Sequence, residues 1–178
     1  MYFQKNKVTF TYLIQQRGIQ MIVREIEQQD NEIVASIIRH SLESVGLNIK
    51  GTAYFDPYLD KLSKYYSSLE SAAYWVAVLD GEVVGGVGIA PFSKENSTCE
   101  LQKLYLSPKA QGKGYSKLLM ETALDFAAKH YDNCYLETRQ QLKAACALYE
   151  KFGFELLSKP LAGSEHSAMD AWYIKKFR

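Results

Sequence analysis

Leu101–Met120 reads LQKLYLSPKAQGKGYSKLLM and is the stretch that decides the fold. Its pattern predicts a strand, a short loop and a helix, because apolar residues first follow an extended segment and then recur at helical spacing. We expect the strand to span Thr98–Leu106. Its apolar positions step by three from Leu101 to Leu104, where strict alternation steps by two, so a one-residue bulge is expected near Gln102–Lys103.

A glycine-rich loop connects this strand to the helix. Gly112 and Gly114 allow the backbone to come close to a ligand, because they carry no Cβ atom. Free N–H groups at the helix start, together with the helix dipole, form an anion site that suits phosphate. The alternative is a loop-to-helix turn that binds nothing. The apolar side of the helix is expected at Leu118, Leu119, Ala123, Phe126 and Ala127.

The loop sequence QGKGYS, residues 111–116, resembles the Gln/Arg-x-x-Gly-x-Gly/Ala signature of the GNAT superfamily of acetyl-CoA-dependent N-acetyltransferases. In that family the loop holds the pyrophosphate of acetyl-CoA, so the resemblance implies acetyl-CoA as cosubstrate and no metal. Ser116 stands where Gly or Ala is usual; serine is small and keeps its N–H, so we expect altered detail rather than lost binding. The cofactor-binding residues implied are Leu104, Tyr105, Leu106, Gln111, Gly112, Lys113, Gly114, Tyr115, Ser116 and Lys117.

These residues have different expected roles. By the resemblance, the backbone of Leu104, Tyr105 and Leu106 pairs with the pantetheine arm like an added strand, and one N–H there can stabilise an oxyanion. The alternative is that this strand is simply paired with its neighbour. Lys113 and Lys117 lie nearest the loop and are the lysines expected to help hold the phosphates, although lysines are more often a solvated face.

A second segment, ALYEKFGF at residues 147–154, resembles the family's LYxKxGF segment. There the tyrosine commonly lies near the thioester sulfur, so the resemblance implies that Tyr149 protonates the departing thiolate. The alternative is a tyrosine that only packs on a helix. Leu148 and Phe152 already supply a core-facing pair, which favours the functional interpretation. Leu142 stands where many members carry an asparagine that contacts the cofactor, so that side-chain contact is not expected.

Glu100 lies on the central strand, just before the expected bulge. In a number of similar sequences a glutamate here is the proposed general base, often acting through a water. An acceptor amine arrives mostly as ammonium and must lose a proton before it attacks. The alternative, an exposed strand charge, has equal weight, because titratable residues at strand ends are common away from active sites.

Composition places the chain among ordinary globular proteins. Its 178 residues suffice for one domain, and 47% are hydrophobic and 23% charged. The formal net charge of +1 gives no broad field that points to nucleic acid or membrane. Three cysteines and the absence of an export signal predict reduced thiols in a cytoplasmic protein. His40, His130 and His166 are scattered, and we interpret them as surface or packing histidines.

The remaining pattern predicts the order β-α-α-β-β-β-α-β-α-β-β, which is the GNAT order. The fold class expected is α/β (α+β), a mixed, mostly antiparallel sheet with helices on both faces, whose fourth and fifth strands splay apart. Residues 1–20 form an extension, either an edge strand or disordered, before a single acetyltransferase domain at 21–178. The other expected strands are Met21–Arg24, Tyr74–Leu79, Glu82–Pro91, Cys134–Thr138, Phe154–Leu157 and Ala168–Lys175.

Three further helices are expected. Asp30 is the expected N-cap of the first, which ends at Gly46, and Asp56-Pro57 is expected to start the second, which runs to Ser67. Leu142–Phe152 is the expected last helix. The apolar face of the first helix is expected at Ile33, Val34, Ile37, Ile38, Leu42 and Val45.

In the GNAT family the first two helices and their loop cover the acceptor site. Here that segment would suit a small amine with an apolar body, although any single aromatic is more often core. Its aromatic and acidic residues are Tyr54, Phe55, Tyr58, Tyr65, Tyr66, Asp56 and Asp60.

Two functional hypotheses follow. The first is an N-acetyltransferase that transfers acetyl from acetyl-CoA to a primary amine, on a small molecule or peptide, by direct attack in a ternary complex. A covalent mechanism through Cys99 or Cys146 is not favoured, because the sequence indicates no histidine partner for either cysteine. The second is a non-catalytic acyl-CoA-binding sensor, left open by Ser116 and Leu142. Neither identifies the acceptor or the oligomeric state, although dimers are frequent among similar proteins.

Overall fold

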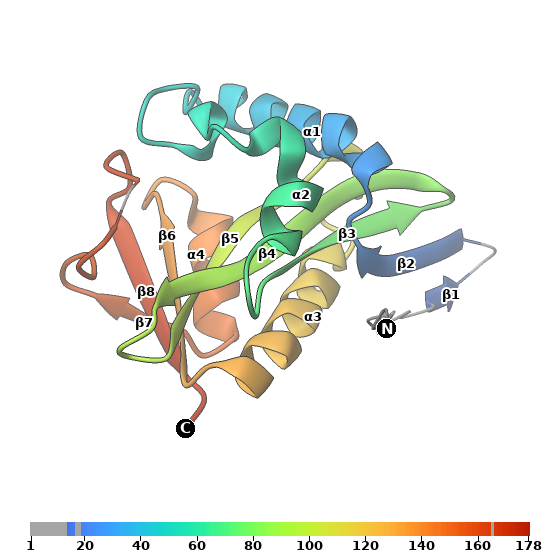
Figure 1. The fold of residues 1–178 in the computed structure, drawn as a ribbon. Helices are drawn as coiled ribbons and strands as arrows, with labels where there is room; N and C mark the ends of the chain where they lie inside the picture. The colour runs from blue at the N-terminus through green and yellow to red at the C-terminus, as the bar shows by residue number, and fades with distance from the viewer. Residues whose placement is uncertain (1–13, 17–18, 165) are drawn as a thin grey trace.

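The computed structural model describes residues 14–16, 19–164 and 166–178. Its described strands form one eight-stranded sheet in the order β1-β2-β3-β4-β5-β6-β8-β7 (Figure 1). β5 and β6 are parallel and every other neighbouring pair is antiparallel, as the sequence predicts. The strands are β1 Ile14–Gln16, β2 Ile19–Glu25, β3 Ala73–Leu79, β4 Glu82–Ser93, β5 Thr98–Leu106, β6 Asn133–Thr138, β7 Glu155–Leu157 and β8 Ala171–Lys176.

The extension supplies an edge strand. β1 pairs antiparallel with β2, and β2 begins at Ile19 rather than at Met21. Residues 1–13 lie outside the described part of the chain. The turn between β3 and β4 is the hairpin that the sequence predicts. Asp80 and Gly81 form it, and both have positive φ angles, of 49° and 85°.

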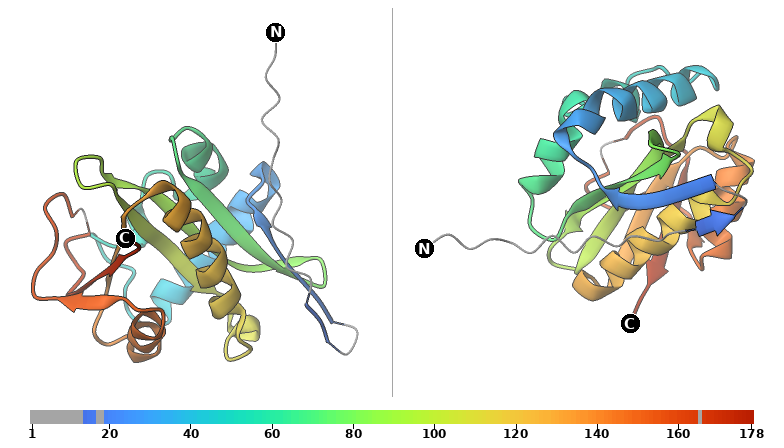
Figure 2. Two further views of the ribbon diagram at one scale, coloured as in Figure 1. Left: turned by 90° about the horizontal axis from the view of Figure 1, so that it is seen from below. Right: turned by 90° about the vertical axis from the view of Figure 1, so that its right-hand side faces the viewer.

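Helices cover both faces of the sheet (Figure 2). On one face lies the segment 31–67, which we call the roof; it packs on β3, β4 and β5. α3 packs on the other face, across β2 to β6, and α4 contributes to the same hydrophobic cluster. The α-helices are α1 Asn31–Glu43, α2 Leu62–Ser67, α3 Tyr115–His130 and α4 Lys143–Lys151; short 3₁₀ helices lie at η1 Gln28–Asp30, η2 Ala53–Phe55, η3 Leu59–Lys61 and η4 Pro108–Ala110.

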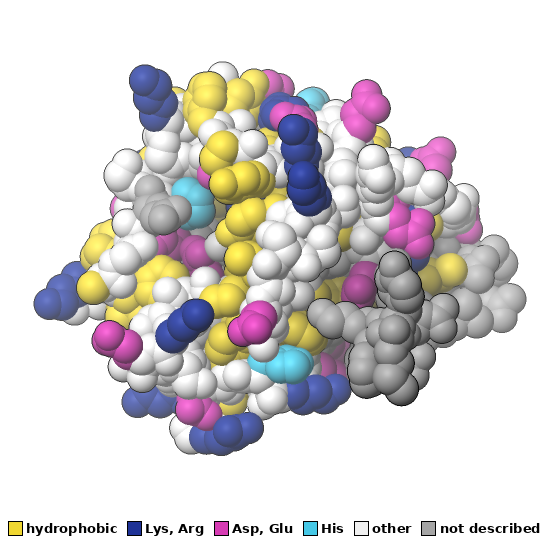
Figure 3. Space-filling model, viewed as in Figure 1, with side chains coloured by type: hydrophobic (Ala, Val, Ile, Leu, Met, Phe, Trp, Pro, Cys, Tyr) yellow, Lys and Arg dark blue, Asp and Glu magenta, His cyan; other side chains and the backbone are white. Residues whose placement is uncertain are grey.

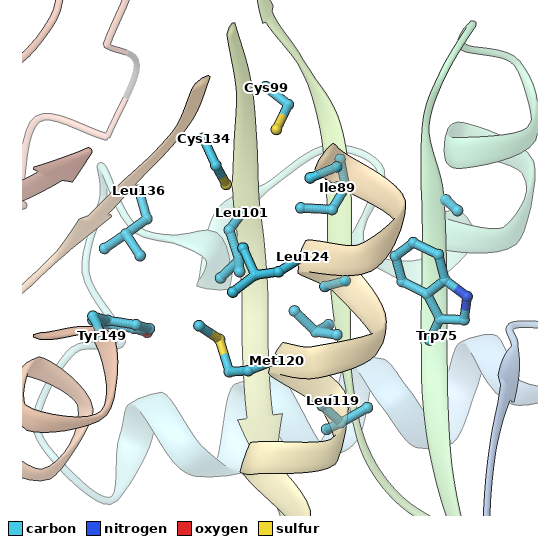
Figure 4. Close-up of a cluster of buried hydrophobic side chains, with 14 of the residues drawn as sticks. Trp75, Ile89, Cys99, Leu101, Leu119, Met120, Leu124, Cys134, Leu136 and Tyr149 are labelled. Carbon is cyan, nitrogen blue, oxygen red and sulfur yellow. The ribbon is translucent and has the colours of Figure 1, made fainter. Parts of the chain in front are cut away.

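Each face has its own hydrophobic core. Beneath the roof, Ile38, Leu62 and Tyr66 pack on the sheet. Below the sheet, Leu119 and Met120 of α3 meet side chains from the central strands, as Figure 4 shows. Among the described residues, no helix has the length and apolar character needed to cross a membrane.

The expected bulge in β5 is confirmed. Gly86 pairs with Tyr105 and Gly88 with Gln102, so β5 contributes one extra residue between these rungs. Lys103 at the bulge has a φ of 53°, a left-handed conformation that is uncommon for a lysine. The bulge bends β5 and turns the Lys103 side chain toward the roof, where it meets Asp56.

Three helix predictions are wrong in detail. Asp30 is the N-cap residue of α1, as expected, but its side chain makes no cap hydrogen bond; its carboxylate accepts hydrogen bonds from Arg24 and the Glu27 N–H. Ile33 and Val45 are 44% and 41% exposed and lie off the buried face of α1. Asp56 does not begin a helix, because η3 starts at Leu59; a side chain expected to cap a helix is instead an ion-pair partner in a pocket.

Candidate active site

The central strands separate at Glu100. β5 and β6 form parallel rungs at Thr98, Cys99 and Glu100, and beyond the Glu100–Tyr135 pair no further rung joins them. Within the described part of the chain, the edge of β5 that faces β6 therefore has no strand partner from residue 101 to Leu106. This is the splay that the GNAT resemblance predicts. Backbone groups on such an edge can pair with an extended ligand as with an added strand.

Glu100 is held at the apex of this splay. Its Oε2 accepts a 2.6 Å hydrogen bond from the Gln102 amide, whose oxygen accepts one of 2.8 Å from the Tyr66 hydroxyl in the roof. A Cβ atom at Gly88 would overlap the Tyr66 hydroxyl, so glycine is required on β4 for this chain of contacts. Burial raises the pKa of Glu100, and the hydrogen bond from Gln102 offsets part of that shift.

Two further ionisable side chains face Glu100. Glu137 lies on β6, on the same face of the sheet, and His166 lies on the loop before β8. His166 Nδ1 is 4.0 Å from Glu100 Oε1 and 3.7 Å from Glu137 Oε2. The Glu137 side chain is 2% exposed and the Glu100 side chain 12%. Figure 3 shows acidic side chains recessed beside a histidine between the roof and this loop.

Asp56 connects this group to the roof. Its carboxylate lies 2.6 Å from Lys103 Nζ and 3.5 Å from His166 Nε2. Burial by itself raises the pKa of Asp56, but the contacts with His166 and Lys103 outweigh it and lower that pKa to about 2. The contact with Asp56 raises the pKa of His166 and outweighs burial, which lowers it. The Lys103 side chain is 7% exposed, so this ion pair is largely shielded from solvent.

A small cavity of about 220 Å³ opens onto these groups. Its walls combine the ion-pair residues with aromatic and proline side chains of the roof and β4. A larger open hollow of about 1250 Å³ lies elsewhere, between η1, α2 and β3. Asp60 and Tyr66 of the roof line it, but Glu100, Tyr149 and the residues of the cofactor loop do not. We therefore take the smaller cavity as the candidate acceptor site. Its lining includes Asp56, Tyr58, Tyr65, Phe92, Glu100, Gln102, Lys103 and His166.

The glycine-rich loop has the geometry of an anion cradle. Gly112 and Gly114 have φ angles of 72° and 82°, and no protein atom lies within 4 Å of a Cβ built on either. Gly114 is the N-cap of α3. Among the described residues, no acceptor for the N–H groups of residues 112–116 is found. These donors can therefore bind phosphate oxygens.

The side chains of the loop are open to solvent. Lys113 and Lys117 are exposed, and Lys117 Nζ lies 3.6 Å from Glu121. The Gln111 amide donates a 3.1 Å hydrogen bond to the Leu106 carbonyl, which ties the loop to the end of β5. The arrangement fits a diphosphate held by backbone N–H groups with lysines nearby; the individual lysine roles stay a prediction.

Tyr149 lies on the other side of the splay from Glu100. It is 7% exposed, projects from α4 into the cluster of Figure 4, and contacts the rings of Phe154 and Tyr173. Burial raises the pKa of Tyr149, so its hydroxyl stays protonated at neutral pH. Leu104 and Leu106, from the unpaired part of β5, pack against the same hydrophobic cluster as Tyr149.

The sequence interpretation missed part of this site. His166 was expected at the surface or in packing, yet it bridges three carboxylates. Glu137 was not predicted as a site residue, whereas Asp56 was named among the acidic residues of the segment expected to cover the acceptor site. The sequence of β6 indicates where Glu137 lies once the strands are paired. Tyr135 pairs with Glu100, and Glu137 is two residues further along the strand, so its side chain lies on the same face of the sheet as that of Glu100. The three cysteines are free thiols: Cys99 and Cys134 are buried, and Cys146 is partly buried.

Comparison with known proteins agrees with this geometry. The acetyltransferase (GNAT) family matches residues 45–154. The uncharacterized N-acetyltransferase YjgM of Escherichia coli is 43% identical over 148 residues, which cover 82% of this chain and 88% of YjgM. Two solved structures share the fold. A GNAT acetyltransferase of Staphylococcus aureus has a TM-score of 0.75 at 19% identity, over 89% of this chain and 99% of that one.

The second structure is an acetyltransferase of Salmonella typhimurium with its cofactor acetyl-CoA. It has a TM-score of 0.71 at 18% identity and covers 89% of this chain and 94% of its own. The protein described here therefore belongs to the GNAT acetyltransferase family. It is an N-acetyltransferase that uses an acyl-CoA, which confirms the family and the enzyme class predicted from the loop and the splayed strands.

Proposed function

We propose that this enzyme transfers acetyl from acetyl-CoA to a primary amine of a small molecule or peptide, by direct attack in a ternary complex. The observation that carries this proposal is the separation of β5 and β6 at Glu100, with the α3 anion cradle nearby and a polar cavity beneath the roof. Acetyl-CoA supplies the acetyl thioester when bound. The chain's own residues then position the amine and move two protons.

The cofactor side is formed by the loop and the unpaired strand edge. The N–H groups of residues 112–116 bind the diphosphate, with Lys113 and Lys117 nearby. The backbone of Leu104, Tyr105 and Leu106 pairs with the extended arm, which orients the reactive end toward the cavity. The open space at Gly112 and Gly114 and the missing rungs beyond Glu100 support this assignment.

Glu100 is the proposed general base. The raised pKa of Glu100 is closer to neutral pH than that of an ordinary glutamate, which makes its carboxylate a better proton acceptor at that pH. The hydrogen bonds that run from Tyr66 through Gln102 fix its orientation. Tyr149 is the proposed general acid, whose hydroxyl donates a proton to the leaving sulfur. Its burial keeps that proton on the oxygen until the thiolate forms.

The proposed acceptor is a small amine rather than nucleic acid or a membrane component. The net charge of +1 provides no broad basic surface, and the cavity of about 220 Å³ is below the usual range for drug-sized ligands. We propose that the enzyme acts in the cytoplasm, without a catalytic metal, and that it can form a homodimer.

An acetylation screen tests this proposal. Purified protein with acetyl-CoA is offered small primary amines and peptides, and release of free thiol is recorded with and without each acceptor. We expect acceptor-dependent release for at least one small amine. Cofactor binding without any acceptor-dependent release would favour the non-catalytic acyl-CoA sensor instead.

A further inference from the structure

One buried carboxylate oxygen beside His166 and Glu100, two residues of the cavity wall, has no hydrogen-bond donor among the described residues. Glu137 Oε1 accepts a 3.0 Å hydrogen bond from the Tyr135 hydroxyl, but no described residue donates one to Oε2. The Glu137 side chain is 2% exposed, so water does not readily solvate it. A buried acceptor without a donor is costly, and native proteins usually satisfy such groups with a ligand or water.

The unsatisfied oxygen faces two other acceptors. His166 Nδ1 lies 3.7 Å from Glu137 Oε2 and 4.0 Å from Glu100 Oε1. The relevant atoms of all three residues lie within 4.8 Å of one another. The other ring nitrogen of His166, Nε2, is directed at Asp56. When His166 is neutral and carries its proton on Nε2, its Nδ1 presents a lone pair toward Glu100 and Glu137. Three acceptors then converge on one point.

We propose that Glu137, His166 and Glu100 form the binding site for the ammonium group of the acceptor. This inference rests on the proposed acetyl transfer and adds two positioning residues, Glu137 and His166, to it. Each of the three acceptors takes one N–H of the ammonium, and Glu100 then removes the proton that must leave before attack. The site selects primary amines, because three N–H donors are needed to satisfy it.

The separations of the three acceptors can be compared with those around an ammonium nitrogen and around a divalent metal. Acceptors arranged tetrahedrally around a nitrogen at hydrogen-bond distance lie about 4.6 Å apart, whereas ligands of a Zn²⁺ ion lie about 3.4 Å apart. The measured separations of 3.7 and 4.0 Å lie between these two values, so the choice of an ammonium ion rests on the chemistry of Glu100 and on the charge balance. A metal bound to Glu100 would also occupy the lone pair that a general base needs.

The charge balance also favours a cation here. Asp56, Glu100 and Glu137 face Lys103 and His166, and Lys103 is already paired with Asp56. When His166 is neutral, two carboxylates remain without a full positive partner. A bound ammonium therefore competes with the proton of His166 for the same place, so that binding one displaces the other.

A titration with ethylammonium chloride tests the site without knowledge of the true acceptor. The imidazole signals of His40, His130 and His166 are followed by NMR, with the His166 signal identified from a His166→Gln sample. We expect a saturable shift at His166 alone, together with a fall in its apparent pKa. Tetramethylammonium, which has no N–H, should leave the signal unchanged.

Variants identify the residue responsible. Glu137→Gln keeps the acceptor for the Tyr135 hydroxyl and should weaken ethylammonium binding at least about tenfold. Glu43→Gln is the matched control, because Glu43 accepts a 2.6 Å hydrogen bond from the Tyr54 hydroxyl outside the cavity. It should bind as the wild type does. A His166 shift with Zn²⁺ or Mn²⁺ but not with ethylammonium would overturn the proposal.

Kinetics separate this inference from the proposed function. With an amine found in the acetylation screen, Glu137→Gln should raise KM for the amine at least about tenfold and leave KM for acetyl-CoA unchanged. An unchanged amine KM overturns the ammonium site while acetyl transfer stands. Ethylammonium binding at His166 without acetylation of any amine has the opposite meaning: the site exists, and the proposed function fails.

Discussion

Tyr149 has a buried hydroxyl, and its role depends on a single proton. Tyr149→Phe keeps the ring contacts with Phe154 and Tyr173 and removes only that donor. If the hydroxyl protonates the leaving sulfur, kcat should fall by roughly 10²-fold or more while acetyl-CoA affinity changes little. Tyr173→Phe is the control in the same cluster and should retain wild-type turnover. Near-normal turnover of Tyr149→Phe, with chemistry rate-limiting, would assign Tyr149 to packing.

Glu100 is the second residue whose protonation decides activity. Glu100→Gln keeps size and cannot accept a proton, so acceptor-dependent turnover near neutral pH should fall by roughly 10²-fold. Raising the pH should recover part of the loss, because more amine arrives deprotonated; the wild type should depend less on pH over that range. Matching rates and pH profiles for variant and wild type would make Glu100 only a strand charge.

The raised pKa of Glu100 also predicts a cost in stability. Its ordinary value is 4.5, and burial raises the folded-state pKa above it, so ionisation destabilises the fold as the pH rises through this range. Glu100→Gln should therefore have a higher Tm than the wild type at pH 7, and the difference should shrink toward pH 4. A lower Tm at pH 7 would contradict this sign.

At the scale of elements, the loop before α3 couples backbone conformation to cofactor binding. Gly114→Val places a branched side chain where φ is 82° and where the ligand approaches, so acetyl-CoA affinity by calorimetry should fall at least about tenfold, or ~1.4 kcal/mol. Gly46→Val is the matched control: Gly46 has a φ of 71° and equally open surroundings, and it belongs neither to the cofactor loop nor to the cavity lining. The Gly46→Val variant should carry the same backbone strain and bind acetyl-CoA with wild-type affinity. Equal affinities would remove the loop from the cofactor site.

The whole molecule is held together in part by one shielded ion pair between roof and sheet. Asp56 contacts His166 and pairs with Lys103 across this interface, and these contacts lower its pKa from the ordinary 3.8 to about 2. Because the pKa of Asp56 is lower in the folded chain than in the unfolded chain, its ionised carboxylate stabilises the fold above pH 3.8. This stability is lost as the pH falls toward 2. The difference corresponds to about 2 kcal/mol of unfolding free energy.

Asp56→Asn should remove that contribution. We expect the unfolding free energy at pH 7, from denaturant titration, to fall by about 2 kcal/mol or more, since Lys103 stays buried without its partner. Below pH 4 the stability of the variant should depend less on pH. Asp60→Asn is the control: Asp60 pairs with Arg39 but is 64% exposed, so its loss should matter little. Equal losses in both variants would refute a special role for the Asp56 pair.

The sequence by itself determined the parts of this protein that depend on local chemistry. The step from Leu101 to Leu104 indicated the bulge, Gly112 and Gly114 indicated the anion cradle, and the order of periodic segments indicated the sheet. These signals are local, because a turn, a bulge or a helix start depends on neighbouring residues. Glu100 and Tyr149 were reached only through their resemblance to family motifs, and their roles remain predictions.

The tertiary structure alone decided which side chains meet around His166. Asp56, Glu137 and His166 come from the roof, β6 and the loop before β8, and no spacing in the chain relates them. Asp56-Pro57 is a good local helix start, yet its carboxylate is held by Lys103, because a buried ion pair formed by packing outweighs a solvated cap. Long-range packing brings these groups within a few ångströms, and their electrostatic coupling exists only once the roof and sheet meet.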